Sequence, residues 1–331
     1  ELIRRLGAEA CYTIDFGNHK DANEFLIHNG SDMLAGIINN ASPVPLENVL
    51  TLSDVSNELK EFIKEGFKPG YQIGLEPFDN IFSTYTGQFI TVTGVPSSGK
   101  SDFVDRMIIG YYLKYGWKTA FASPENKPTF LHGHKLIRKI GGWMPRETDI
   151  GSDKWNEVTD VVNNNFFFIE NERYDLDSVL EKGAELVKRK GIKCLVIDPY
   201  NKVKMNGASN MSITDATMEY LTRVEAFAKK HDVLVIVVAH PTKMYKKDDG
   251  TIDEPNMYNI KGGGEWYDAS YHGLLVHRDY EKQTVKVKVL KVKFQNLGEN
   301  QAEAHFTWDK VSGNYIPITQ QIKNDMPWEV D

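Results

Sequence analysis

The sequence has few cysteines, no long apolar run and no excess of basic residues, and each absence narrows the functions that it can have. Its two cysteines, Cys11 and Cys194, lie far apart, and Cys194 stands in an apolar, strand-like run. We therefore expect neither a disulfide framework nor a zinc site. The longest apolar run, Val233 to Ala239, is far shorter than the roughly 20 residues of a membrane-spanning helix. We expect no membrane insertion and an intracellular location.

The chain is acidic, with a formal net charge of -7. Proteins that coat nucleic acid with their whole surface usually carry a basic footprint instead. Local binding is not excluded, because a ring can confine its basic residues to a central channel. The chain starts with Glu1 rather than Met, so we expect a fragment or a processed chain.

Strand and helix patterns alternate from about residue 71 onward. Continuous apolar runs separated by helical patterns predict a doubly wound, mostly parallel α/β sheet with helices on both faces, and the last strands read as an antiparallel β extension. The expected parallel strands are 88–94, 117–123, 165–170, 192–198 and 232–240, the helices between them are 99–115, 128–140, 175–190 and 213–230, and the antiparallel strands are 273–278, 284–294 and 304–309.

The segment GVPSSGKS is a full match to the P-loop pattern GxxxxGK[ST], between a strand pattern and a helix pattern. Its glycines let backbone N–H groups turn toward phosphate, Lys100 reaches the β- and γ-phosphates, and the Ser101 hydroxyl binds Mg²⁺. We expect ATP or another nucleoside triphosphate here, with Mg²⁺; a Gly/Ser turn without a ligand is the alternative. The expected nucleotide-binding residues are Gly94, Val95, Pro96, Ser97, Ser98, Gly99, Lys100, Ser101 and Asp102.

Three polar residues at strand ends are candidates to complete a catalytic site. Asp198 ends the strand LVID, where a carboxylate holds the Mg²⁺ shell, partly through water. Glu125, just past the strand WKTAFAS, is the candidate base for the attacking water, and His240 is a candidate sensor of the γ-phosphate. Each has a plainer alternative, namely a strand cap, a solvated loop carboxylate and a satisfied strand-end imidazole.

Two stretches without apolar periodicity, 201–212 and 243–264, are candidate DNA-binding loops. Long irregular loops in a compact domain are usually functional or disordered. Their lysines would contact phosphates, which gives affinity without base choice, and solvated charged loops are the alternative. The candidate residues are Lys202, Lys204, Lys243, Lys246, Lys247, Lys261, Gly262 and Gly263.

The order of these motifs resembles the helicase domain of the DnaB family, in particular that of phage primase-helicases and mitochondrial Twinkle. GVPSSGKS, ASPE, VIDPY, VVAHPTK, VHRD and LKVKF follow one another within residues 45–318. The resemblance implies a RecA-like ATPase that unwinds DNA at a replication fork. It implies single-stranded and forked DNA, further copies of the chain in a hexameric ring and a replicative polymerase as partners. It favours the cytoplasm of a bacterial or phage-infected cell over the mitochondrial matrix.

The resemblance also implies residue roles. Glu125 matches the catalytic glutamate, Asp198 the metal-shell carboxylate and His240 the phosphate-sensing histidine. Arg278 matches an arginine near the bound nucleotide, and Trp308 falls where relatives place an aromatic against the base.

A basic pair in the tail strand, Lys291 and Lys293, matches residues that act on bound nucleotide. Relatives usually have arginine at the second place, where it acts across the subunit interface on the neighbour's γ-phosphate. Lysine keeps the charge but lacks the bidentate fork, so trans-activation is expected to be weaker or to rest partly on Arg278. A surface lysine is the alternative for Lys293.

The N-terminal segment CYTIDFGNHKDANEFLIHNG resembles the end of the TOPRIM fold of such primases. An unrelated helical extension is the alternative. We expect no primase activity from this chain, because the metal-binding core of a TOPRIM fold would precede Glu1. The predicted organisation is a TOPRIM remnant (1–40), a linker with a subunit-docking helix (41–70), a RecA-like helicase domain (71–320) and a tail (321–331).

Two rival functions share the P-loop. One is a recombinase of the RecA or RadA class, and the other is a regulatory ATPase like KaiC that is not a motor. The HPTK and KVKF elements and the TOPRIM-like start favour the helicase.

Overall fold

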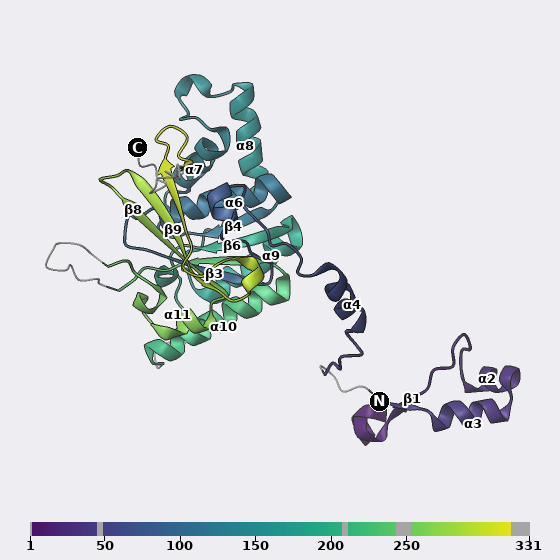
Figure 1. The fold of residues 1–331 in the computed structure, drawn as a ribbon. Coiled ribbons are helices and arrows are strands. Elements are labelled where there is room, and N and C mark those ends of the chain that lie inside the picture. The colour runs from purple at the N-terminus through teal and green to yellow at the C-terminus, as the bar shows by residue number, and fades with distance from the viewer. Residues whose placement is uncertain (1, 45–48, 207–210, 243–252, 319–331) are drawn as a thin grey trace, which may run out of the picture. The chain divides into compact units, whose positions relative to one another are not determined.

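The computed structural model describes residues 2–44, 49–206, 211–242 and 253–318. The chain forms two compact units, Glu1–Lys68 and Pro69–Asp331 (Figure 1). Three candidate DNA-binding residues, Lys243, Lys246 and Lys247, and the predicted tail at 321–331 lie outside the described residues. Within the described ranges, no helix combines the length and apolarity that crossing a membrane requires.

The first unit consists of short helices and one antiparallel strand pair. The Asp21 carboxylate accepts a hydrogen bond from the backbone N–H of Glu24 at 2.9 Å, an N-cap that fixes the start of α2. Among the described residues of this unit only Phe25 is buried, so its own apolar core is small. Its elements are α1 (Leu2–Leu6), β1 (Tyr12–Thr13), α2 (Ala22–Asn29), α3 (Ser31–Asn39), β2 (Ser42–Pro43) and α4 (Ser56–Glu65).

A nine-stranded sheet runs through the second unit in the order β11-β10-β9-β8-β3-β7-β6-β4-β5. The six strands from β8 to β5 in this order are parallel, and β9, β10 and β11 extend the sheet in antiparallel fashion. The predicted doubly wound sheet with its antiparallel extension is therefore confirmed. The strands are β3 (Phe89–Thr93), β4 (Lys118–Ala122), β5 (Phe166–Phe168), β6 (Ile192–Ile197), β7 (Leu234–Val238), β8 (His272–Asp279), β9 (Thr284–Val292), β10 (Glu303–Trp308) and β11 (Tyr315–Pro317).

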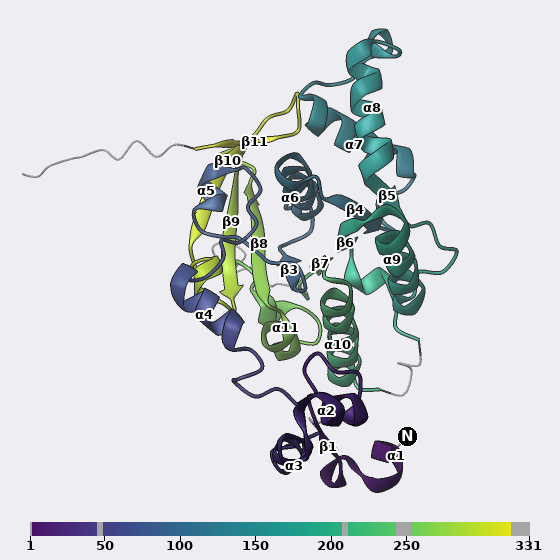
Figure 2. The same cartoon turned by 90° about the vertical axis from the view of Figure 1, so that its right-hand side faces the viewer.

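Helices cover both faces of this sheet (Figure 2). Successive side chains of a strand point to opposite faces, so Ile90 joins a core with α6, α7 and α8, whereas Phe89 joins a core with α9, α10 and α11. Helix α8 was not predicted from the sequence. The helices of this unit are α5 (Glu76–Asp79), α6 (Lys100–Tyr115), α7 (Thr129–Gly141), α8 (Asp153–Asn165), α9 (Leu176–Lys190), α10 (Ile213–His231) and α11 (Gly264–Ala269).

The carboxyl ends of the parallel strands meet at one edge of the sheet. β3 and β7 pair in register through Val92 and Val238, and β4 and β6 pair through Ala122 and Ile197. The segments that follow β3, β4, β6 and β7 therefore start close together, which is where ligands bind in open α/β sheets. These segments carry the P-loop, Glu125, Asp198 and His240.

Candidate nucleotide-binding site

The P-loop takes a conformation that depends on its glycines. Gly94 has a φ of 149° and Gly99, the N-cap of α6, has a φ of 90°, values that residues with a Cβ rarely adopt. A Cβ on Gly94 would also collide with the carbonyl oxygen of Val276. The loop is thus held against β8, and α6 presents its N-terminus to whatever the loop encloses.

Lys100 lies folded against its own loop. Its Nζ donates hydrogen bonds to the carbonyl oxygens of Gly94 at 2.8 Å and Val95 at 2.9 Å. Burial lowers the pKa of Lys100 to about 8, and the negative charges of Asp198 and Glu125 oppose that shift. The ammonium therefore has carbonyl partners that phosphate oxygens would replace.

Ser101 and Asp198 form the candidate metal position. Burial raises the pKa of the Asp198 carboxyl group, and the nearby Ser101 hydroxyl opposes that shift. Asn126 Nδ2 lies 3.5 Å from Asp198 Oδ2, and the nearby Ser98 hydroxyl is buried with no hydrogen-bond partner among the described residues. A hydroxyl and a carboxylate fit Mg²⁺, a hard cation that takes oxygen ligands, so the residues present suit a magnesium-bound nucleotide.

Glu125 lies between two residues from neighbouring strand ends. Its Oε1 lies 3.7 Å from Lys202 Nζ and its Oε2 lies 3.9 Å from His240 Nε2. The carboxylate is 46% exposed, so water can reach it. Burial, followed by the charge of Lys100, lowers the pKa of His240, which favours a neutral ring beside the phosphate position.

Trp308 lies on the other flank of the P-loop, between two guanidinium groups. The guanidinium carbons of Arg278 and Arg138 lie 4.9 Å and 5.4 Å from the centre of its ring. The indole Nε1–H donates to Asp102 Oδ2 at 3.1 Å, which ties β10 to the first turn of α6. Both guanidinium groups therefore make cation–π contacts with the Trp308 ring beside the P-loop.

Two residues of this flank were not predicted from the sequence. Tyr280 donates its hydroxyl to the carbonyl oxygen of Ser97 at 2.6 Å, and Arg138 donates to the carbonyl oxygens of Val311 at 2.8 Å and of Lys310. Tyr280 follows the VHRD motif by one residue, which was its only sequence signal. Nothing in the spacing marks Arg138.

Lys291 and Lys293 lie at the other edge of the same sheet. β9 runs antiparallel to β8, so Lys291 pairs with Gly273 and the strand ends beside His272, the residue that pairs with Ile90 near the start of β3. Lys291 donates to the carbonyl oxygens of Tyr267 and Asp268, and Lys293 Nζ lies 4.3 Å from the centre of the Tyr271 ring. The pair is therefore not part of the P-loop site of its own chain.

The described candidate DNA-binding residues occupy two neighbouring loops. Lys202 ends a short 3-10 helix, and the backbone of Lys204 bonds Tyr174 and Leu176, so this stretch is more ordered than the sequence predicts. Gly262 has a φ of 103°, and a Cβ there would collide with the side chain of Thr217. A pocket of about 420 Å³ joins the two loops, and its lining includes Asn201, His240 and Lys261.

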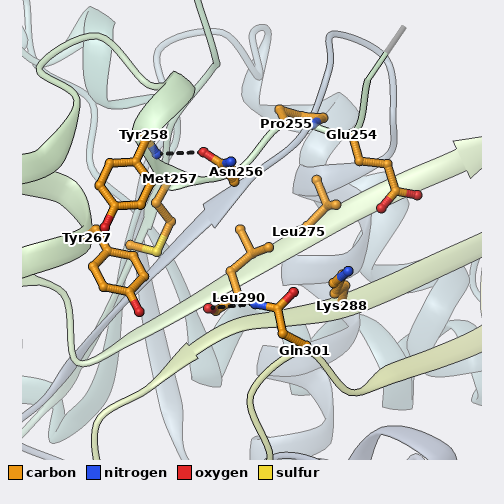
Figure 3. Close-up of a pocket in the computed structure, with 10 residues that line it drawn as sticks. All are labelled: Glu254, Pro255, Asn256, Met257, Tyr258, Tyr267, Leu275, Lys288, Leu290 and Gln301. Atoms are coloured by element: carbon orange, nitrogen blue, oxygen red, sulfur yellow. Dashed lines mark hydrogen bonds between the residues drawn. The ribbon is translucent and has the colours of Figure 1, made fainter. Parts of the chain in front are cut away.

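A separate pocket of about 370 Å³ lies against β8 and β9, and no P-loop residue lines it (Figure 3). The rings of Tyr258 and Tyr267 stack at its side with their centres 5.0 Å apart, and Glu254 and Lys288 stand at the opposite side. This pocket is distinct from the nucleotide-binding site.

Comparisons with known proteins agree with this geometry. Residues 133–245 match a family model described as an AAA domain. The Twinkle homolog protein, chloroplastic/mitochondrial, of Arabidopsis thaliana is 30% identical over 344 residues, which cover 96% of this chain and 48% of that protein. The chain thus spans about half the length of this curated relative.

Two solved structures share the fold at 16% identity. One is described as an ATPase domain, with a TM-score of 0.67 over 82% of this chain and 100% of that one. The other is a DnaB-like replicative helicase described with its interactions with primase, with a TM-score of 0.64 over 90% of this chain and 74% of that one.

The strand order and these fold matches give the second unit the fold of RecA-like helicase ATPase domains. The chain is thus similar in sequence to a Twinkle homologue and in fold to a DnaB-like replicative helicase.

Proposed function

We propose that this chain is the helicase part of a primase-helicase, a ring-shaped motor that hydrolyses ATP to move along single-stranded DNA and to unwind duplex at a replication fork. The observation that carries this proposal is the assembly of Lys100, Ser101, Asp198, Glu125 and His240 at one sheet edge of a DnaB-type domain. The similarity to the Twinkle homologue and to the DnaB-like replicative helicase supports this proposal over the alternatives, a recombinase and a regulatory ATPase.

In this proposal Lys100 leaves the Gly94 and Val95 carbonyl oxygens for the β- and γ-phosphates, while Ser101 and Asp198 hold Mg²⁺, directly or through water. The bound metal would neutralise charge that develops on the phosphate oxygens. Glu125 orients the attacking water and takes its proton, and His240 contacts the γ-phosphate and changes partner when that phosphate leaves. The exposed Glu125 carboxylate and its 3.9 Å approach to His240 support these roles.

Across the subunit interface, Lys293 or Lys291 would contact the γ-phosphate of the nucleotide that a neighbouring copy binds. Their place at the sheet edge away from the P-loop supports a role in trans over one in cis. Arg278 and Trp308 would instead serve the nucleotide of their own chain, with Trp308 against the base. A ring, hexameric in this proposal, makes each hydrolysis event depend on two subunits.

DNA would contact the two loops that follow β6 and β7, through Lys202, Lys204, Lys261 and the glycines Gly262 and Gly263. The same loops carry Lys202 beside Glu125 and His240 beside Lys261, so DNA and nucleotide would act on adjoining residues. The lysines outside the described residues, Lys243, Lys246 and Lys247, are included in this proposal.

The first unit is proposed to be the end of a TOPRIM-like region (1–40) and a linker whose helix docks on an adjacent subunit (41–70). A replicative polymerase is a further proposed partner. We propose a cytoplasmic location in a bacterial or phage-infected cell; the Arabidopsis relative is, by its name, a chloroplast and mitochondrial protein.

The proposal is tested by the hydrolysis rate with and without single-stranded DNA. We expect DNA to raise the rate severalfold and electron microscopy of the DNA-bound chain with a non-hydrolysable nucleotide to show rings. A rate that does not respond to DNA would favour the regulatory ATPase, and open filaments on DNA would favour the recombinase.

A further inference from the structure

A buried, hydrogen-bonded pair of side chains joins α6 and α7 near the candidate metal position. His132 on α7 places its Nε2 2.9 Å from Asp105 Oδ1 on α6, and the two side chains are only 2% and 3% exposed. Burying a carboxylate is costly unless hydrogen bonds compensate it. Neither residue belongs to the P-loop pattern. The cost of burying this carboxylate therefore indicates that the pair has a function of its own.

The surroundings of His132 fix its role in the pair. Its ring packs edge-on against Phe121 and Phe168, with ring centres 4.5 Å and 5.3 Å away. Its Nδ1 is buried and has no hydrogen-bond partner among the described residues. A proton on Nδ1 would lack an acceptor, so the arrangement of least cost puts the proton on Nε2, which donates it to Asp105.

Asp105 faces the same region as the metal position. It follows Ser101 by one helical turn, so both side chains lie on one face of α6. Burial raises the pKa of Asp198, the Ser101 hydroxyl lowers it, and the charge of Asp105 raises it further, so these three side chains lie close to one another.

We propose that His132 is a positioning residue for the magnesium shell: by holding the Asp105 carboxylate in α6, it keeps this second carboxylate from competing with Asp198 for Ser101 and for the metal. The inference rests on the proposed nucleotide site. A hydrogen-bond donor that orients a carboxylate behind a metal site commonly controls the affinity of that site.

In this proposal, loss of His132 weakens magnesium binding because the Asp105 charge remains. Without its donor, the carboxylate is left buried and unpaired and turns toward the Ser101 hydroxyl. Removing the charge as well removes the competitor. A role of His132 in packing alone would instead lower stability and leave the magnesium requirement unchanged.

The experiment measures binding of a non-hydrolysable ATP analogue by calorimetry over a series of Mg²⁺ concentrations, together with the melting temperature of each variant. His132→Phe removes the donor and keeps a ring in place; His132→Met is used if that variant does not fold, because Met adapts to irregular space. His132→Gln keeps a donor, and His134→Phe, on the same helix and partly exposed, is the matched control.

We expect His132→Phe to raise the Mg²⁺ concentration for half-maximal binding by about tenfold, the lower range for loss of a residue behind a metal ligand. In His132→Gln and His134→Phe this Mg²⁺ concentration should stay near the wild-type value. Adding Asp105→Asn to His132→Phe should bring it back to the wild-type value. Either of two results would overturn the inference. In the first, His132→Phe lowers the melting temperature but leaves the Mg²⁺ concentration for half-maximal binding unchanged. In the second, Asp105→Asn alone raises that concentration as much as His132→Phe does. Failure of the wild-type chain to bind the analogue would instead sink the proposed nucleotide site.

Discussion

Lys202 and Glu125 form an ion pair, with Lys202 Nζ 3.7 Å from Glu125 Oε1. The pair joins a lysine of the first candidate DNA-binding loop to the proposed catalytic base. A DNA phosphate that attracts Lys202 would release the carboxylate, so the pair offers a direct link between DNA binding and hydrolysis.

We predict that Lys202→Ala raises the hydrolysis rate in the absence of DNA and reduces the ratio by which DNA stimulates it. Exposed ion pairs are worth about 0.2–1 kcal/mol, so the increase should be at most about fivefold. Steady-state rates with and without single-stranded DNA measure both effects. Lys204→Ala, which changes a neighbouring exposed lysine, serves as the control for the rate without DNA. An unchanged rate without DNA in Lys202→Ala would show that the pair does not restrain Glu125.

Glu125→Gln should bind ATP and DNA but hydrolyse ATP very slowly. The amide keeps the shape of the side chain and loses the proton acceptor, and general base catalysis typically contributes about 10²–10⁴-fold. Single-turnover hydrolysis and nucleotide binding, measured on the same preparation, separate the two effects. Loss of binding with unchanged single-turnover chemistry would remove Glu125 from the role of base.

Lys293→Ala should severely reduce DNA-stimulated hydrolysis while each chain still binds nucleotide, because the group is proposed to act on a neighbour's phosphate. Lys293→Arg should be tolerated or should raise the rate, since a guanidinium can bridge two phosphate oxygens. Hydrolysis and nucleotide binding of both variants are the measurements.

Mixing Lys293→Ala with Lys100→Ala tests the geometry of that action. A chain without Lys100 can present Lys293 to its neighbour but cannot hydrolyse ATP itself. A chain without Lys293 can hydrolyse ATP if its neighbour presents that residue. Mixed rings should therefore recover activity that neither pure preparation shows. Wild-type rates in Lys293→Ala would make it a surface lysine and move the role to Arg278 or Lys291.

His272 should make the second unit less stable in acid. The ring is fully buried, with Nε2 2.8 Å from Gln88 Oε1, and burial, followed by the charge of Lys291, lowers the pKa of His272 from 6.5 to about 3. Between these two values the unfolded chain binds the proton and the folded one does not, so the free energy of unfolding falls as pH falls through this window.

Urea unfolding at pH 7 and pH 5 checks this. The loss of stability between the two pH values should be up to about 2 kcal/mol larger in the wild type than in His272→Gln. His305→Gln, at a residue 41% exposed, should lose as much as the wild type. Equal losses in all three proteins would mean that His272 titrates normally.

Much of the sheet and of the P-loop site could be predicted from the sequence, because fully buried parallel strands leave continuous apolar runs such as Val233 to Ala239. Glu125, Asp198 and His240 follow the ends of these strands. They were predicted to lie together because the carboxyl ends of parallel strands meet at one edge of the sheet, and they do lie together. Helix α8 was missed. Its buried residues, Val158 and Val162, are few and stand among polar ones, so the pattern is weak.

Other features depend on tertiary contacts that no local pattern contains. The position of Lys291 and Lys293 at the far sheet edge follows from the antiparallel pairing of β9 with β8. Asp105 and His132 are 27 residues apart in the chain and lie on two different helices. Asp105 carries a weak signal, one turn after Ser101, whereas nothing in the sequence around His132 marks it as buried.

The most direct test of the central claim is strand separation on a forked DNA duplex by the wild-type chain with ATP and Mg²⁺. Forks with a single-stranded tail of either polarity are compared, and Lys100→Ala, checked for an intact fold by circular dichroism, is the control. We predict ATP-dependent unwinding on at least one fork, and none with Lys100→Ala, which loses a direct phosphate contact. DNA-stimulated hydrolysis by the wild type without strand separation on either fork would contradict the assignment as a helicase.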